Sequence, residues 1–387
     1  MKILQLSKDY YPRIGGVSNH VTNLSKALAI NGDEVHVVTV SSYQKKEYQH
    51  YIDQKVHIHS FRIREGGAFL GKIFFYSFRL PFMFTKYVTD YGPFDIIHQH
   101  DYRATKLLAY LLKKKSKSVL VMTSHTPRLF KQNSFLEIFF IKYILNVNGI
   151  ISVSRELFEK ATNIFKQAFH IYIPNGIEKD LFKKFDEVDT QYFSNTGKFI
   201  IFCPSRWSVE KGIHYLIDAI KLIYKKNNTK FHKMEFHFAG DTSTDRHTKV
   251  CIKKIKRQIN KDLYLNLHMW GECDRERMFK LYKFSDIVVI PSEYEAVNIS
   301  MLEAVYFLKP IIATKVGGLF EILKTESAAE LIEPKKVGDI YNAILKYFDL
   351  YYKKESRAVY DISLEDFDWL HIAKKTKIFY LEVLSKE

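Results

Sequence analysis

Short apolar runs alternate along this chain of 387 residues with segments in which apolar residues recur at helical spacing. Residues 2–6 are predicted to form a first strand, and residues 35–40 form an apolar run typical of a strand buried on both faces of a parallel sheet. Residues 21–29 between them have helical spacing. The strand–helix–strand order is therefore set within the first forty residues, and it predicts an α/β fold.

The same alternation restarts after a polar, weakly patterned segment. We place a first domain at residues 1–180, a linker at 181–197 and a second domain at 198–365. The second domain opens with the apolar run 199–203. Residues 366–387 form a separate C-terminal segment, in which Trp369, Ile372, Phe379 and Val383 follow a helical period.

Composition narrows the class of protein and the choice of partners. The chain is 47% hydrophobic and 26% charged, as in globular proteins, and its net charge of +16 favours an anionic partner. That partner is a nucleic acid, an acidic membrane face or a phosphate-bearing substrate. The three cysteines suggest no disulfide framework, and neither a signal peptide nor an apolar run of membrane-spanning length is evident. We therefore expect a cytoplasmic protein.

The chemistry centres on the loop and helix start at residues 291–304. Asn298 is a predicted N-cap, which would leave the amides of Ile299 and the next residues free to bind an anion. Glu295 and Glu303 flank this position, and carboxylates suit the paired hydroxyls of a ribose or a sugar ring. The stretch therefore has the groups that bind a nucleotide sugar. The alternative is an ordinary helix start with Glu303 on a solvated face.

Two further strand-to-helix loops carry candidate phosphate ligands. Gly15 and Gly16 would allow a close approach of the backbone to a phosphate, although taken alone they favour a tight turn without a ligand. Arg206 and Lys211 follow the strand at 199–203 and offer a planar fork and a point charge to phosphate oxygens. The alternative interpretation is that Arg206 and Lys211 lie in a solvated loop and bind no phosphate, because the whole chain is basic.

Histidines occur where two predicted strands of the first domain end. His98 and His100 lie on one strand and His125 ends another, and the carboxyl ends of strands face the ligand crevice in open α/β sheets. Two ligands on one strand with no third partner evident do not predict a metal site. A structural role for His125, capping its loop, remains an alternative.

Aromatic and basic residues interleave in segments 66–88 and 136–145. Such segments can lie in a membrane interface. The alternative is a pair of helices packed on the sheet, with their lysines extending to water.

Taken in order, these motifs resemble those of the retaining glycosyltransferase family 4. The resemblance rests on Pro-Ser before Glu295, the seven residues between Glu295 and Glu303, the spacing of Arg206 and Lys211, and two Gly-Gly loops. Val297 and Asn298 stand where the family commonly has an aromatic residue and a glycine. The resemblance implies the GT-B arrangement: two Rossmann-like domains facing each other across a cleft, with a C-terminal helix that crosses back to the first domain.

The resemblance also implies a reaction and roles for residues. A sugar would move from a nucleoside diphosphate sugar to a glycan or lipid-linked acceptor, with retention at the anomeric carbon and without a cofactor or metal. Beyond the nucleotide sugar and acceptor, an anionic membrane surface is an expected partner and nucleic acid is not. The implied roles are catalysis by His100 and Glu295; phosphate binding by Gly15, Gly16, Arg206, Lys211, Asn298 and Ile299; ribose and sugar binding by Glu303, Glu295 and Val297; a base-side loop at Trp270, Gly271 and Glu272; and an acceptor side at His125.

Two other functions fit the sequence. A sugar-nucleotide epimerase on the same fold would convert the donor without an acceptor. A non-catalytic basic module would bind an anionic membrane or nucleic acid.

Overall fold

Two units, each built around one mainly parallel β-sheet, make up the chain. The computed structural model describes residues 1–13, 15–41, 44–63, 75–100, 102–125, 135–178, 197–240, 253, 265–295, 298–355 and 358–386. One unit comprises 1–176 and 365–387, and the other comprises 177–364. The predicted linker 181–197, apart from Gly197, and the predicted sugar ligand Val297 lie outside the described residues.

The described part of the first unit contains an eight-stranded sheet in the order β3-β4-β2-β1-β5-β6-β7-β8. All neighbouring strands pair in parallel except β3, which is antiparallel to β4 at the edge. The strands are β1 Lys2–Leu6, β2 Glu34–Ser41, β3 Tyr48–Asp53, β4 Val56–Arg62, β5 Ile96–Gln99, β6 Val119–Ser124, β7 Gly149–Ser152 and β8 Phe169–Tyr172.

Helices cover both faces of this sheet, because successive strand residues point to opposite sides. In β1, Ile3 belongs to the core under α1 and α16, whereas Leu4 belongs to the core under the remaining helices. The helical segments of this unit are α1 Gly16–Ile30, η1 Phe75–Arg79, α3 Leu80–Tyr87, η2 Thr89–Tyr91, α4 Tyr102–Lys115, α5 Phe135–Phe139, η4 Phe140–Leu145, α6 Arg155–Ile164 and α16 Trp369–Leu384, with η6 Leu364–Phe367 before α16.

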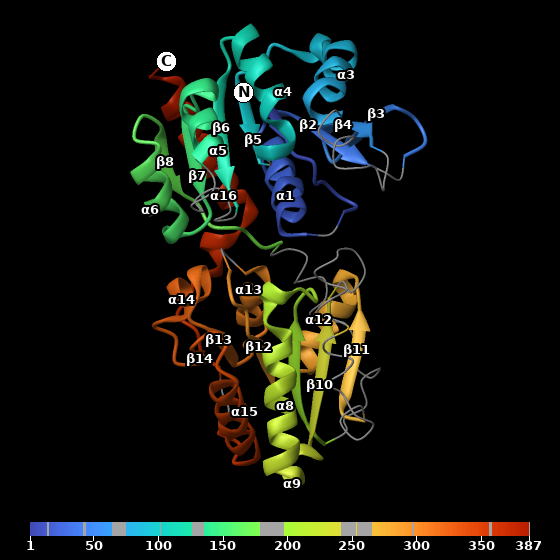
Figure 1. Cartoon of the computed structure of the whole chain (residues 1–387), viewed down its shortest axis with the longest axis vertical. Coiled ribbons are helices and arrows are strands. Elements are labelled where there is room, and N and C mark those ends of the chain that lie inside the picture. Colours follow the sequence, from blue (N-terminus) through green and yellow to red (C-terminus); the bar gives the residue numbers. More distant parts are fainter. Residues whose placement is uncertain are drawn as a thin grey trace. The chain divides into compact units, whose positions relative to one another are not determined.

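The C-terminal helix α16 is part of the first unit, as the sequence predicts. Figure 1 shows it, coloured red, among the blue and green elements of that unit. It packs along α1, and its Tyr380 hydroxyl hydrogen-bonds Nδ1 of His98 at 2.6 Å in the core. The chain therefore returns to its first sheet after completing the second.

The second unit has a six-stranded parallel sheet in the order β11-β10-β9-β12-β13-β14. Helices α8 and α15 pack together over one face, against Phe199 and Ile201 of β9, while Phe202 faces α12 on the other side. The elements are β9 Phe199–Pro204, η5 Val209–Lys211, α8 Ile213–Lys226, α9 Asn228–Phe231, β10 Met234–Ala239, β11 Leu267–Gly271, α12 Arg275–Phe284, β12 Ile287–Ile290, α13 Ile299–Tyr306, β13 Ile311–Thr314, α14 Gly317–Leu323, β14 Ala329–Ile332 and α15 Val337–Tyr352.

Candidate functional site

The strand order of each sheet reverses at one place, and the predicted site residues lie there. In the second unit the chain runs from β9 outward to β11, then returns to β12 beside β9 and continues in the opposite direction. Ligands of open α/β sheets bind at this reversal, outside the carboxyl ends of the strands. Arg206 and Lys211 follow β9, and Glu295 and Asn298 follow β12, so the fold brings the two predicted loops together.

Glu295 is the centre of these contacts in the second unit. Its side chain is buried, and its Oε1 accepts hydrogen bonds from Ser292 Oγ at 3.0 Å and from Asn298 Nδ2 at 2.7 Å. The ammonium group of Lys211 contacts the same oxygen. A buried carboxylate with three donors is held in one orientation.

Close backbone packing fixes the two loops against each other. Gly212 has φ +66°, and a Cβ there would lie 1.9 Å from the carbonyl oxygen of Pro291. Only glycine fits this position, which places Lys211 directly beside the loop that carries Glu295. The hydroxyl of Ser300 also donates to the carbonyl of Pro204 at 3.1 Å and ties the start of α13 to the end of β9.

The start of α13 has the predicted anion-binding geometry. Asn298 is its N-cap, because its Oδ1 accepts from the amide of Met301 at 3.1 Å, which confirms the predicted cap. The helix begins at Ile299, and no acidic side chain occupies its first turn. Its free amide groups therefore leave a positive helix end at the sheet reversal.

Glu303 is buried, so the alternative that places it on a solvated face is wrong. Its Oε1 accepts from Arg275 Nη1 at 2.5 Å. Burial alone would lower the pKa of Arg275, but the neighbouring carboxylates Glu303 and Glu178 reverse this, and the pKa lies above its ordinary value. The sequence analysis missed Arg275, although an arginine at the start of a helix after β11 was visible in the pattern.

Arg206 and the predicted base-side loop lie at the rim of this region. The Arg206 side chain is half exposed and contacts Glu210 at 3.4 Å, which leaves most of its guanidinium facing solvent. Trp270 donates from Nε1 to His237 Nδ1 at 3.0 Å at the end of β11, followed by Gly271 and Glu272. A role of this loop at the base of a nucleotide remains a prediction.

In the first unit the strand order reverses between β1 and β5. Gly15 and Gly16 follow β1, and Gly16 begins α1. His100 follows β5, and His125 follows β6 beside it. These predicted residues therefore share the carboxyl edge of the first sheet, where its own ligand site is expected.

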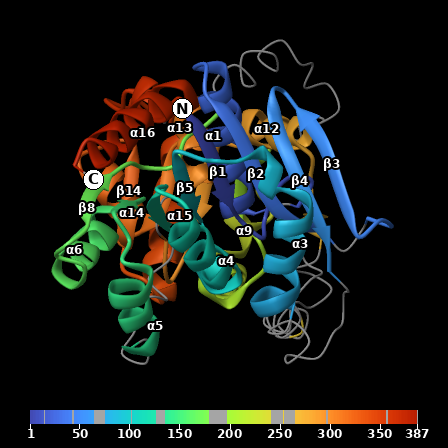
Figure 2. The ribbon, with the colours of Figure 1, turned by 90° about the horizontal axis from the view of Figure 1, so that it is seen from above.

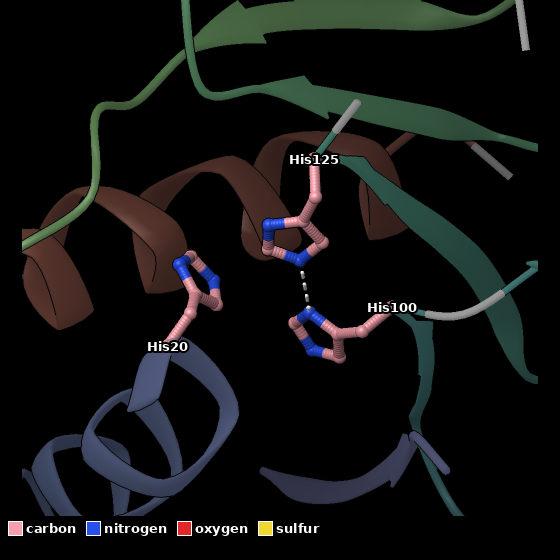
Figure 3. Close-up of side chains that lie close together, drawn as sticks. All are labelled: His20, His100 and His125. Atoms are coloured by element: carbon pink, nitrogen blue, oxygen red, sulfur yellow. Dashed lines mark hydrogen bonds between the residues drawn. The ribbon is translucent and has the colours of Figure 1, made fainter. Parts of the chain in front are cut away.

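Three histidines meet at this edge (Figure 3). His100 Nδ1 lies 3.2 Å from His125 Nε2, and His20 on α1 faces both rings. Burial and repulsion from neighbouring histidines lower the pKa of His100 and His125 well below the ordinary value, and burial lowers that of His20 to about 4. The rings are therefore neutral at pH 7. The sequence analysis missed His20, and its statement that no third partner accompanies His100 is wrong.

His98 is engaged elsewhere. Its ring is fully buried, with Nε2 at 2.6 Å from the Thr123 hydroxyl and Nδ1 bonded to Tyr380 of α16. It therefore connects β5 to its neighbours in the core, and the role predicted for His100 remains a prediction.

Each unit thus offers a different set of groups at its sheet reversal. The second unit combines two buried carboxylates, two cations and a positive helix end, which together can bind hydroxyl groups and phosphate oxygens. The first unit combines a glycine-rich helix start with three neutral imidazoles, which can exchange hydrogen bonds with hydroxyl groups.

Two family models match consecutive parts of the chain. The model described as Glycosyltransferase Family 4 matches residues 14–181, and the model described as Glycosyl transferases group 1 matches residues 184–361. The boundary between them falls in the polar segment that the sequence analysis treats as a linker.

Curated relatives match nearly the whole chain. An uncharacterized glycosyltransferase of Methanocaldococcus jannaschii is 29% identical over 350 residues, covering 89% of this chain and 88% of its own length. The phosphatidylinositol N-acetylglucosaminyltransferase GPI3 subunit of Saccharomyces cerevisiae is 24% identical, covering 99% of this chain and 83% of its own length.

Solved structures share the architecture. Sucrose-phosphate synthase from Thermosynechococcus elongatus superposes with a TM-score of 0.76 at 19% identity, covering 100% of this chain and 99% of that one. HepE of Anabaena, solved in complex with UDP and glucose, gives a TM-score of 0.72 at 20% identity, with 98% and 99% coverage. At sequence identities this low, the similarity shows a shared fold and nothing more.

Proposed function

Because the chain belongs to glycosyltransferase family 4 and has the GT-B fold of two Rossmann-like domains, we propose that it transfers a sugar with retention at the anomeric carbon. The donor is a nucleoside diphosphate sugar. The observation that carries the proposal is the buried Glu295 carboxylate, which Lys211, Ser292 and Asn298 hold beside the start of α13. The carboxylate and the cation of this loop pair support the binding of hydroxyl groups and phosphate oxygens.

The second unit supplies the donor site. Departure of the nucleoside diphosphate builds negative charge on its phosphate oxygens, and preorganised cations and amides stabilise such charge. Arg206, Lys211 and the amides of Ile299 and Ser300 are these groups, since the next amide, that of Met301, bonds Asn298. The resemblance to family 4 assigns further backbone donors to Gly15 and Gly16. This supply of positive charge supports transfer without a metal ion on the diphosphate.

The two carboxylates bind the hydroxyl groups of the donor. Glu295 binds the donor sugar together with Val297, and Glu303, oriented by Arg275, binds the ribose. The loop Trp270, Gly271 and Glu272 lies on the side of the base. His100 lines the reacting side of the sugar, and His125 next to it faces the acceptor.

The acceptor is a glycan or a lipid-linked sugar presented at an anionic membrane. Large apolar side chains on the helical segments of the first unit support this: Phe82 on α3, Phe135 on α5 and Tyr143 on η4 are 69%, 73% and 60% exposed. Figure 2 shows α3, α4 and α5 along one side of this unit, and α4 contacts α3 and η4, the segment that follows α5. Aromatic side chains beside lysines match the chemistry of an interface with anionic lipids.

The described helices include none with the length and apolar character of a membrane span. We therefore propose peripheral binding through this aromatic face, at the cytoplasmic side of the membrane, rather than insertion.

Incubation with a panel of nucleotide sugars tests the reaction. With a lipid-linked or glycan acceptor present, we expect release of a nucleoside diphosphate and formation of a product whose anomeric configuration matches that of the donor. Conversion of the donor to an isomer without acceptor would instead identify an epimerase. Neither product with any donor, despite bound nucleotide, would contradict the transferase.

A further inference from the structure

The histidine cluster of the first unit has the composition and spacing of a metal site. His20, His100 and His125 each offer one ring nitrogen, and these three nitrogens lie within 4.8 Å of one another. The residues come from α1 and from the ends of β5 and β6, so they approach one point from three elements (Figure 3). Imidazole nitrogens from three histidines form a common zinc-binding set.

Hydrogen bonds fix the tautomers of two of the rings. His20 donates from Nδ1 to the amide oxygen of Asn175 at 2.8 Å, which leaves its Nε2 with a lone pair. That Nε2 is buried and has no hydrogen-bond partner among the described residues. His100 Nε2 contacts the amide oxygen of Gln5, which likewise leaves the His100 Nδ1 lone pair facing His125.

This pattern is that of metal-binding histidines, in which the distal ring nitrogen donates to an oxygen and the other nitrogen faces the ion. Here Asn175 and Gln5 occupy the places of those outer oxygens. The 3.2 Å between His100 Nδ1 and His125 Nε2 also fits. Metal–nitrogen bonds of about 2.0–2.1 Å at the tetrahedral angle separate two ligand nitrogens by about 3.3 Å.

A second cluster in the chain differs in what surrounds its ligand atoms, although it too has buried ring nitrogens without a hydrogen-bond partner among the described residues. Glu235, His237 and His268 also come within 4.8 Å of one another. However, Trp270 donates to Nδ1 of His237, so the proton of that neutral ring sits on Nε2, facing Glu235 at 3.5 Å. Lys198 contacts Glu235 at 3.2 Å and competes for the carboxylate. A metal ion would have to displace both interactions, so this cluster is an internal control.

We propose that His20, His100 and His125 bind one divalent transition-metal ion such as Zn²⁺, with the fourth position open to water or a substrate oxygen. Imidazole ligands favour zinc, cobalt, nickel and copper over magnesium and calcium, which prefer oxygen. The proposed ion is therefore of a different kind from the oxygen-preferring ions, such as Mg²⁺, that would neutralise a diphosphate. Since His100 and His125 are also proposed to face the sugars, a bound ion occupies their hydrogen-bonding positions and inhibits transfer.

Direct binding measurements test this site independently of any activity. Protein freed of metal with a chelator and then desalted is dialysed against Zn²⁺, and Co²⁺ is added in parallel as a spectroscopic probe. We expect one Zn²⁺ per chain and the visible absorption of four-coordinate cobalt, while Mg²⁺ in excess does not compete.

Substitutions locate the ion. His20→Gln and His125→Gln should each weaken Zn²⁺ binding at least tenfold and abolish the cobalt absorption, whereas His268→Gln in the other cluster should leave both unchanged. Asn175→Leu, which removes only the oxygen behind His20, should weaken binding about 10–100-fold. Thermal melting verifies that each variant is folded. If one of the two histidine variants does not fold, the other still tests the site.

Absence of Zn²⁺ binding to the wild type overturns the proposal. Binding that survives both His20→Gln and His125→Gln, or that is lost in His268→Gln, also overturns it. None of these results depends on transferase activity, so a failure of the metal site is distinguishable from a failure of the proposed reaction.

Discussion

Lys211 and Glu295 form an ion pair across two loops of the second unit that are 84 residues apart in the chain. Neighbouring strands β9 and β12 bring these loops together, and Gly212 permits the contact of their backbones. The pair therefore joins a candidate phosphate ligand to a candidate sugar ligand before any donor binds.

Replacing Lys211 tests its role on the phosphates. Lys211→Ala should lower kcat/KM at least tenfold, because a charge that stabilises the leaving diphosphate is lost, at a cost of about 1.4 kcal/mol or more. The fold should survive, since Ser292 and Asn298 still bond Glu295. Lys346→Ala, which removes another paired lysine on α15, is the control and should change the rate less than twofold. Unchanged turnover in Lys211→Ala would remove this residue from the site.

The Arg275–Glu303 pair predicts a stability effect. Arg275→Met leaves the buried Glu303 carboxylate without its cation and should lower the free energy of unfolding by about 3 kcal/mol. The double variant Arg275→Met/Glu303→Leu should recover most of this loss, because no unpaired charge remains. Urea denaturation of the single and double variants measures both. Equal stability of Arg275→Met and the wild type would show that the pair has no structural role.

Acid should destabilise the first unit through His59. Its ring is buried, its Nε2 lies 2.9 Å from His36 Nδ1, and burial followed by repulsion from nearby histidines lowers its pKa to about 3. Between pH 6.5 and about pH 3 the unfolded ring binds a proton and the folded ring does not. Each unit of falling pH in this window therefore lowers the free energy of unfolding by up to about 1.4 kcal/mol.

The His59→Gln variant isolates that effect. Its stability should fall less steeply than that of the wild type from pH 6.5 to pH 4, as measured by urea denaturation at several pH values. His371→Gln, at the protein surface, should keep the wild-type slope. Parallel slopes for all three proteins would rule out His59 as the titrating group.

A chelator should leave transfer intact. If Arg206, Lys211 and the amides of α13 neutralise the diphosphate, protein already freed of metal should show the same initial rate with and without excess EDTA, and added Mg²⁺ should not raise that rate. Complete loss of activity in EDTA that Mg²⁺ restores would overturn the metal-free reaction.

Vesicle flotation tests the aromatic face. Wild-type protein should float with anionic vesicles at low salt and lose this binding in about 0.5 M salt, where screening acts over a few ångströms. Phe82→Ser/Phe135→Ser should lower the bound fraction severalfold. Leu265→Ser, which removes an equally exposed apolar side chain from the second unit, should not. No binding to anionic vesicles at low salt would end the membrane proposal.

The sequence predicted the α/β architecture and most of the second unit's site because these depend on local signals. Apolar runs identified the strands, and Asn298 stood at the helix start where its cap was predicted. The sheet order then shows that β9 and β12 are neighbours, so the loops that follow them share one edge.

Side-chain partners that depend on tertiary packing were missed. His20 lies in the second turn of α1 within an apolar segment, and only the folded unit shows that its ring faces those of His100 and His125. A helix that follows β1 begins at the same sheet edge, so this proximity could have been anticipated. The pairing of Arg275 with Glu303 had no such signal, because helical spacing does not say which neighbour a helix start will face.

The position of α16 affects the order in which the protein can be completed on the ribosome. Trp369, Ile372 and Val383 belong to the core of the first unit, yet all of residues 177–364 are synthesised before them. The α16-facing side of the first unit's core therefore stays exposed while the second unit is synthesised. The second unit is continuous in sequence and can fold during this time. Chaperone dependence during synthesis is consequently expected to concentrate on the N-terminal sheet, although it emerges first.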